Sequence, residues 1–466
     1  MGLKYLTGFG NHFSSEALDG ALPKGQNNPQ KCPYGLYAEQ LSGTAFTVAR
    51  HGNKRSWLYR IHPSVQHSHM DNSAIGGLGR AKDEKERVFK VDPNQMRWQP
   101  EDIPKVSDKK VDFVEGITPV GQSGDPKSKS GLAVYTYCVN QSMGKRSLTD
   151  SDGDLLIVPQ TGVLRVQTEF GIMRVEPNEI CVVQRGMRFT VDVESESNRG
   201  YILEVFQGHF VLPDLGPIGS NGLANPQDFE TPVAHFEDKK EEWMCYVKYG
   251  GDMFEMSQHF SPYNVVAYHG NYVPYKYDLR KFCCMNSVTY DHPDPSIYTV
   301  LTCPSAVPGV AVADFVIFPP RWMAMEHTFR PPWFHRNTMT EYMGMIWGQY
   351  DAKKGGFVAG GSSLHSCMIP HGPDASTFTA ASDPSKVDTT KPEFFDKGLA
   401  FMFETTYMLG VSDKALNSKH REYTYQECWK DMPETFSKTK KRLAEGSSDG
   451  SDILTWRKRS KARNGN

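Results

Sequence analysis

The sequence predicts a mainly β protein of jelly-roll architecture. Its composition favours turn-rich β structure over a helix bundle, because it holds 41 glycines and 30 prolines and 12% of its residues are aromatic. Between residues 111 and 210, short runs of β-branched and aromatic residues alternate with Gly, Pro and Asn turns. The runs recur about every eight to twelve residues, a spacing typical of a sandwich or jelly roll.

The expected strands form two sets. The first set contains only His209 and no His/Glu pair at the spacing of metal ligands, so we expect a structural barrel without metal there. The expected strands are Leu132–Cys138, Asp154–Val158, Val163–Thr168, Met173–Val175, Ile180–Val183, Phe189–Val193 and Tyr201–Phe206, then Tyr298–Thr302, Val310–Ile317, His335–Trp347 and Ala400–Leu409. Residues 438–466 are charged, rich in Ser and Gly and poor in apolar residues, so disorder is expected there.

Composition and charge argue against several classes of protein. The net charge of −2, with mixed signs, gives no excess of positive charge that would attract a nucleic acid. No run of 18 apolar residues is present and the N-terminus has no apolar signal core, so we expect no membrane span and no secretion. The nine cysteines are scattered without a CxxC pair, as in a reducing compartment. We therefore expect a cytoplasmic protein.

The candidate chemistry lies in residues 334–347. If they form a strand, His335 and Glu341 project from the same face, because side chains alternate with a period of two. A returning strand or loop would bring His371 beside them. Two imidazoles and one carboxylate on one side of a metal are the ligand set of non-haem Fe(II) oxygenases, which leaves other positions open for substrate and O₂.

Spacing alone does not separate this set from a chance arrangement, because the chain has 15 histidines. However, the pattern His-x-Asn-x₃-Glu-x₆-Gly matches the first metal motif of cupin barrels, with Asn337 where a second ligand histidine often lies. The competing pattern is His67-Ser68-His69, but its neighbours are loop-forming residues and no glutamate follows at the required spacing. We interpret it as a polar loop.

His292 follows an expected strand and precedes Pro293 and Pro295, which force a non-helical loop. A histidine in such a loop can lie at the mouth of a barrel. On sequence grounds alone, a histidine in such a loop is more often a structural residue of the turn than a functional residue.

Several longer motifs connect the chain to a known family. They are YLTGFGN (5–11), GQNNPQ (25–30), LYAEQLSG (36–43), LGPIG (215–219), FRPP (329–332), HRN (335–337) and LHS (364–366). Through them the chain closely resembles the homogentisate 1,2-dioxygenase family, Fe(II) ring-cleaving enzymes of tyrosine and phenylalanine catabolism. The resemblance covers nearly everything from residue 5 to about 430.

The resemblance implies a bicupin of two parts, a large N-terminal β domain and a smaller C-terminal cupin-type barrel that holds iron. We assign these parts to residues 1–285 and 286–437. The resemblance also implies a homohexamer built as a dimer of trimers. Its substrates would be homogentisate and O₂, and its product 4-maleylacetoacetate.

The resemblance further implies roles for individual residues. His335, Glu341 and His371 match the Fe(II) ligands, His292 matches a base or proton shuttle, and Tyr350, His365 and His371 match residues along the substrate. Strict alternation would put Tyr350 on the face opposite Glu341, so a bulge or turn near Gly348 is required. Arg50 is a candidate partner for the acetate group.

Three alternatives remain open at this point. A non-catalytic bicupin would retain no iron, and His335→Ala would have no effect. A Zn²⁺-dependent cupin isomerase would consume no O₂. A gentisate-type dioxygenase would use three histidine ligands, and Glu341 argues against it.

Overall fold

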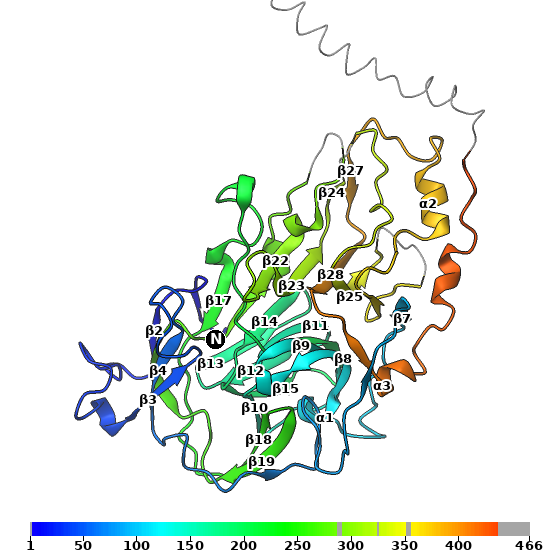
Figure 1. Cartoon of the computed structure of the whole chain (residues 1–466). Coiled ribbons are helices and arrows are strands. Elements are labelled where there is room, and N and C mark those ends of the chain that lie inside the picture. The colour runs from blue at the N-terminus through cyan, green and yellow to red at the C-terminus, as the bar shows by residue number, and fades with distance from the viewer. Residues whose placement is uncertain (1, 287–290, 324–325, 351–355, 437–466) are drawn as a thin grey trace, which may run out of the picture.

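The computed structural model describes residues 2–286, 291–323, 326–350 and 356–436. Within these ranges strands dominate, and they form sheets of ten, seven, six, four and two strands (Figure 1). The predicted mainly β class is confirmed. The predicted disorder of residues 438–466 lies outside the described residues.

The ten-stranded sheet is the central layer, and both of its faces are buried. Along the strand Asp154–Thr161, Leu155 and Ile157 pack into one core while Leu156 and Val158 pack into another. A strand covered on both faces is expected to have a continuous apolar run. The strand order is β1 (Tyr5–Thr7), β17 (Phe229–Pro232), β21 (Tyr275–Asp278), β14 (Glu179–Val183), β11 (Asp154–Thr161), β16 (Asn198–Val205), β9 (Ser130–Val139), β8 (Ile117–Asp125), β29 (Gly410–Ser412) and β6 (Phe89–Lys90).

One further sheet covers each face of this layer. The seven-stranded sheet has the order β13 (Gly171–Val175), β12 (Leu164–Thr168), β15 (Arg188–Val193), β10 (Arg146–Asp150), β18 (Trp243–Tyr249), β19 (Asp252–Gln258) and β5 (Asp71–Asn72). The six-stranded sheet has the order β22 (Thr299–Pro304), β23 (Ala311–Phe318), β28 (Gly398–Thr405), β25 (Thr340–Gly348), β26 (Ser362–His365) and β7 (Met96–Trp98).

The remaining elements are short. The four-stranded sheet joins β2 (Phe13–Glu16), β20 (Val265–Gly270), β4 (Arg55–Arg60) and β3 (Tyr37–Ser42), and the two-stranded sheet joins β24 (Arg321–Met323) and β27 (Glu393–Phe395). The helices are α1 (Phe113–Gly116), α2 (Ala375–Ala381), α3 (Asp413–Leu416) and the 3₁₀ turns η1 (Pro33–Gly35), η2 (Pro126–Ser128), η3 (Gly216–Ile218), η4 (Pro226–Asp228), η5 (Leu279–Lys281), η6 (Pro295–Tyr298) and η7 (Tyr425–Trp429). In the described part of the chain, none of these helices has the length and apolarity needed to cross a bilayer.

The N-terminal and C-terminal parts exchange strands. β7 is an edge strand of the six-stranded sheet, where Arg97 lies opposite Ser363 of β26. In return β29 pairs with β8 of the ten-stranded sheet, and Val411 lies opposite Gly121. Residues far apart in sequence therefore stabilise both sheets.

Alternation along β25 directs one row of side chains outward from the three-layer core. Tyr342 and Ile346 pack toward the ten-stranded sheet, whereas Met343 and Met345 belong to a smaller cluster on the opposite face. Glu341 shares the parity of Met343 and therefore projects to that opposite face. The candidate site is built there.

Most predicted strands are present within a few residues, but His335–Trp347 is wrong at its start. β25 begins only at Thr340. The preceding residues form a loop in which the Asn337 side chain accepts a hydrogen bond from the Met339 amide at 2.8 Å. Such a side-chain turn competes with strand pairing of the backbone.

A buried ion group links two layers of the N-terminal part. Lys248 of β18 forms an ion pair with Glu204 of β16 and lies 3.7 Å from an Asp152 oxygen, and all three side chains are at most 3% exposed. Tyr135 donates to the second oxygen of Glu204 at 2.7 Å. The carboxylates of Asp150, Asp152 and Glu204 lie close enough together to hold a cation, and the Lys248 ammonium supplies that charge.

Lys248→Met is expected to lower the free energy of unfolding by about 3–5 kcal/mol, because it leaves buried carboxylates without their cation. Lys239→Met, at an exposed ion pair with Glu237, should cost at most about 1 kcal/mol. Denaturant-induced unfolding measures both. Equal, small losses in the two variants would contradict this account of the buried group.

Candidate metal centre

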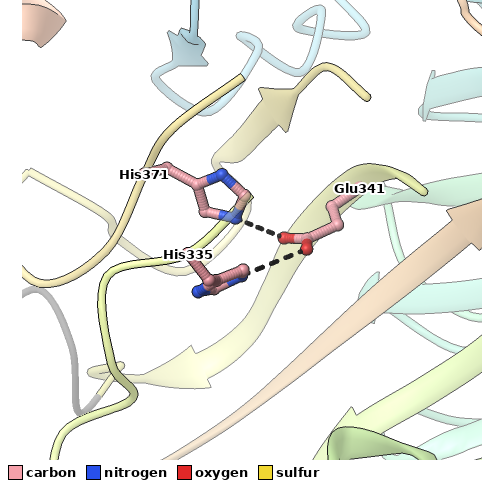
Figure 2. A group of neighbouring side chains, drawn as sticks. All are labelled: His335, Glu341 and His371. Carbon is pink, nitrogen blue, oxygen red and sulfur yellow. Dashed lines mark hydrogen bonds and ion pairs between the residues drawn. The ribbon is translucent and has the colours of Figure 1, made fainter. Parts of the chain in front are cut away.

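The structure brings His335, Glu341 and His371 together on the outer face of the six-stranded sheet (Figure 2). Glu341 is the second residue of β25. His335 precedes that strand and His371 follows β26, and their backbones form an isolated antiparallel bridge with N–O distances of 2.9 and 3.0 Å. This bridge, and not a continuous strand, brings His335 to the same side as Glu341.

The two imidazoles present the same atom to the carboxylate. His371 Nε2 lies 3.0 Å from Glu341 Oε2, and His335 Nε2 lies 3.5 Å from Oε1. Their Nδ1 atoms lie 2.9 Å from the backbone oxygens of Ile369 and Trp333. Because a carbonyl oxygen only accepts, each Nδ1 carries a proton and donates it, so Nε2 is the atom through which a metal would be bound.

The Asn337 side chain orients the Glu341 carboxylate. Its Nδ2 donates to Glu341 Oε1 at 2.8 Å, while its Oδ1 accepts from the Met339 amide. The residue that stands in the place of a second ligand histidine therefore acts here on the Glu341 carboxylate.

Glu341 is ionised in this setting. Burial would raise the pKa of its carboxyl, but the contacts with the imidazoles of His335, His365 and His371 hold the pKa well below its usual value. For His335, burial lowers the pKa, while the contacts with Glu341 and the Trp333 carbonyl raise it above the usual value overall. A metal ion would compete with the proton for the same Nε2 lone pair.

A second carboxyl group faces the site from the neighbouring strand. Glu404 of β28 lies opposite Glu341 in the sheet and lines the same cavity. Burial, followed by repulsion from Glu341 and Asp314, raises the pKa of Glu404 to about 8. Sequence reasoning missed Glu404, although alternation in the run 400–409 gives it the parity of Met402, which lines the same cavity.

The other predicted site residues line one cavity of about 340 Å³ together with the three-residue cluster. His292 Nε2 lies 3.0 Å from the Phe329 oxygen, and its ring lies 5.6 Å from that of Trp333. Tyr350 packs between the rings of Phe318 and Phe357. The expected irregularity before Tyr350 is present, as a register shift between Met345 and Trp347 and a positive φ at Gly348.

His365 lies deeper than the other histidines. It is 3% exposed, stacks on His371 with ring centres 4.3 Å apart, and has its Nδ1 3.6 Å from Glu341 Oε2. By contrast, the His69 side chain is 88% exposed beside Asp71, in the loop predicted for His67-Ser68-His69.

The suggested role of Arg50 is not supported by its position. Arg50 is exposed in the segment between β3 and β4 and does not line the cavity. The arginines that do line it are Arg321, Arg330 and Arg336. Arg321 lies in the short strand β24, and Arg330 and Arg336 lie in the segment between β24 and β25. No periodic pattern marks residues of such a segment as lining a cavity.

Comparison with known proteins decides the family. A model named "Homogentisate 1,2-dioxygenase N-terminal" matches residues 4–279, and its C-terminal counterpart matches residues 280–436. The chain belongs to the homogentisate 1,2-dioxygenase family. The family models meet at 279 and 280, and the predicted division after residue 285 stays a prediction.

Relatives in the homogentisate 1,2-dioxygenase family match over nearly their whole length. The Homo sapiens enzyme of that name is 54% identical over 448 residues, which is 95% of this chain and 99% of the relative. The Mus musculus enzyme is 54% identical over 93% of this chain and 97% of its own. A cupin barrel protein from Leptotrichia buccalis superimposes with a TM-score of 0.26 at 8% identity, over 67% of this chain and 97% of its own. That superposition adds nothing to the fold assignment, which rests on the sheets described above.

Glu341→Ala is expected to reduce Fe(II) binding, measured by anaerobic titration, from one ion per chain to none that survives gel filtration. The variant loses the carboxylate of the cluster, which both imidazoles contact. As a control, replacing His67 and His69 together by Ala should leave the stoichiometry unchanged. If the double variant lost the ion and Glu341→Ala kept it, the metal site would be at the loop.

Proposed function

We propose that this chain is a homogentisate 1,2-dioxygenase in which His335, Glu341 and His371 hold Fe(II). It converts homogentisate and O₂ to 4-maleylacetoacetate in the breakdown of tyrosine and phenylalanine. The observation that carries the proposal is the set of two imidazole nitrogens and one carboxylate facing a single cavity. Family membership supports the choice of substrate.

The donor atoms fit a single ion. The Nε2–oxygen separations of 3.0 and 3.5 Å are close to those of neighbouring ligands held about 2.1 Å from one metal. Two histidines and one carboxylate on one side, with the other positions open, favour non-haem Fe(II) over a closed structural zinc site. Fe(II) bound there would lower the pKa of a ring hydroxyl and offer an open position to O₂.

The chain supplies orientation around that position. Phe318, Phe357 and Tyr350 form an aromatic wall of the cavity, and Met343 and Met402 line it from the sheet. A flat aromatic ring packs well against such walls, which restricts its rotation. Homogentisate therefore binds with its ring held between these side chains and its hydroxyl directed to the three-residue cluster.

His292 is the proposed base. Its Nε2 donates to the carbonyl oxygen of Phe329, so the neutral ring has its lone pair on Nδ1. Nδ1 accepts the proton of the substrate hydroxyl and returns it to the product. The neighbouring Trp333 ring restrains the imidazole.

Oxygen uptake by the protein, reconstituted anaerobically with Fe(II), should match added homogentisate one to one. Gentisate, which lacks the methylene spacer between ring and carboxylate, should give no comparable uptake. His292→Gln should keep bound iron and lower kcat by about 10²–10⁴-fold, the usual contribution of a general base. Absence of uptake despite bound iron would return the chain to the non-catalytic bicupins.

We further infer a homohexamer built as a dimer of trimers, located in the cytoplasm. The family resemblance supports the assembly, and nine cysteines scattered without a CxxC pair agree with a reducing compartment. Sedimentation velocity is expected to give about six times the chain mass of 52.4 kDa. A monomeric or trimeric mass under conditions of full activity would refute the hexamer, and cell fractionation tests the location.

A further inference from the structure

His365 differs from the two proposed ligand histidines in the atom that it presents to Glu341. His335 and His371 direct Nε2 toward the carboxylate, whereas His365 directs Nδ1 toward Oε2 at 3.6 Å. This separation is too long for a full hydrogen bond, but it is short enough for the charge to orient the ring. An ionised carboxylate attracts an N–H and repels a lone pair, so Nδ1 carries the proton.

That tautomer fixes the direction of the next hydrogen bond. His365 Nε2 lies 3.0 Å from the hydroxyl oxygen of Tyr425, and both residues are at most 3% exposed. With the proton on Nδ1, Nε2 is an acceptor, and the Tyr425 hydroxyl is therefore the donor. The donor groups therefore point in one direction: the Tyr425 hydroxyl toward His365 Nε2, and the His365 Nδ1–H toward Glu341.

Tyr425 is held by segments far from the metal cluster. Its ring lies 5.3 Å from Trp429 within η7, and the Arg97 guanidinium lies 4.5 Å from its centre. Arg97 comes from β7 and donates to Glu422 at 2.8 Å. Two distant parts of the chain therefore set the position of one hydroxyl group.

We propose that the Tyr425 hydroxyl is a positioning group for the metal centre, which donates to His365 Nε2 and so keeps the His365 Nδ1–H directed at Glu341. Without that donor, His365 can adopt the other tautomer or rotate, and the carboxylate loses an orienting partner. Outer groups of this kind typically change metal affinity or activity by about 10–100-fold. The proposal rests on the proposed function only through the ligand role of Glu341.

Tyr425→Phe removes the hydroxyl and keeps the ring on which Arg97 and Trp429 pack. Fe(II) affinity, measured anaerobically by competition with a chromogenic chelator, is expected to fall about 10–100-fold. The kcat for homogentisate should fall with it, and KM should stay within about twofold. The matched control is Tyr423→Phe, an exposed tyrosine of the same segment whose hydroxyl donates to the Leu416 carbonyl. This control should change neither quantity.

A second background tests whether the hydroxyl acts through His365. In His365→Gln, adding Tyr425→Phe should change Fe(II) affinity by less than about twofold, because the acceptor is already altered. The same loss in both backgrounds, or no loss in the wild-type background, would overturn the proposal. Thermal melting of the metal-free protein shows whether Tyr425→Phe folds. If it does not fold, His365→Gln tests the proposal by itself, because an Fe(II) affinity of His365→Gln equal to that of the wild type would also overturn the proposal. If the wild-type protein takes up no O₂ with homogentisate, the proposed function is refuted. The comparison of Fe(II) affinities would still test the role of Tyr425.

Discussion

The buried carboxylate of Glu341 is the group on which the rest of the site depends. A carboxylate that is 5% exposed is costly to keep ionised unless opposite charges or donors surround it. Here Asn337 and His335 face one oxygen, and His371 and His365 face the other. The His335–His371 backbone bridge holds together the loops before β25 and after β26. The two imidazoles are therefore positioned jointly around the carboxylate.

The three-layer architecture gives this unit a rigid base. β25 lies inside the six-stranded sheet, whose inner face packs on a ten-stranded sheet that is itself buried on both sides. Sites built on strands are held more accurately than sites built on loops alone. The strand exchange through β7 and β29 ties the site to the N-terminal part. Arg97 of β7 contacts Tyr425, whose hydroxyl lies 3.0 Å from His365 beside the three-residue cluster.

Two carboxyl groups on adjacent strands have opposite protonation states for a physical reason. Glu341 gains imidazole and amide donors, whereas burial and the charges of Glu341 and Asp314 act on Glu404 and outweigh the charge of His335. The same sheet face therefore presents an anion for a metal and, at neutral pH, a largely protonated acid beside it. Environments that separate the pKa values of paired carboxyls are frequent in active sites.

The sequence by itself determined the mainly β class, most strands, and the identity of His335, Glu341 and His371 as a set. The class and the strands follow from alternation and turn residues, which are local signals. The set of three follows from the spacing of His335 and Glu341 together with the motifs that the chain shares with the family. Only the tertiary structure decided that a loop and a backbone bridge bring His335 to Glu341, that Glu404 faces it across the sheet, and that Tyr425 and Arg97 stand behind His365. The contacts of Tyr425 and Arg97 join residues 60 to several hundred positions apart, and no local pattern encodes them, because they depend on which strands become neighbours.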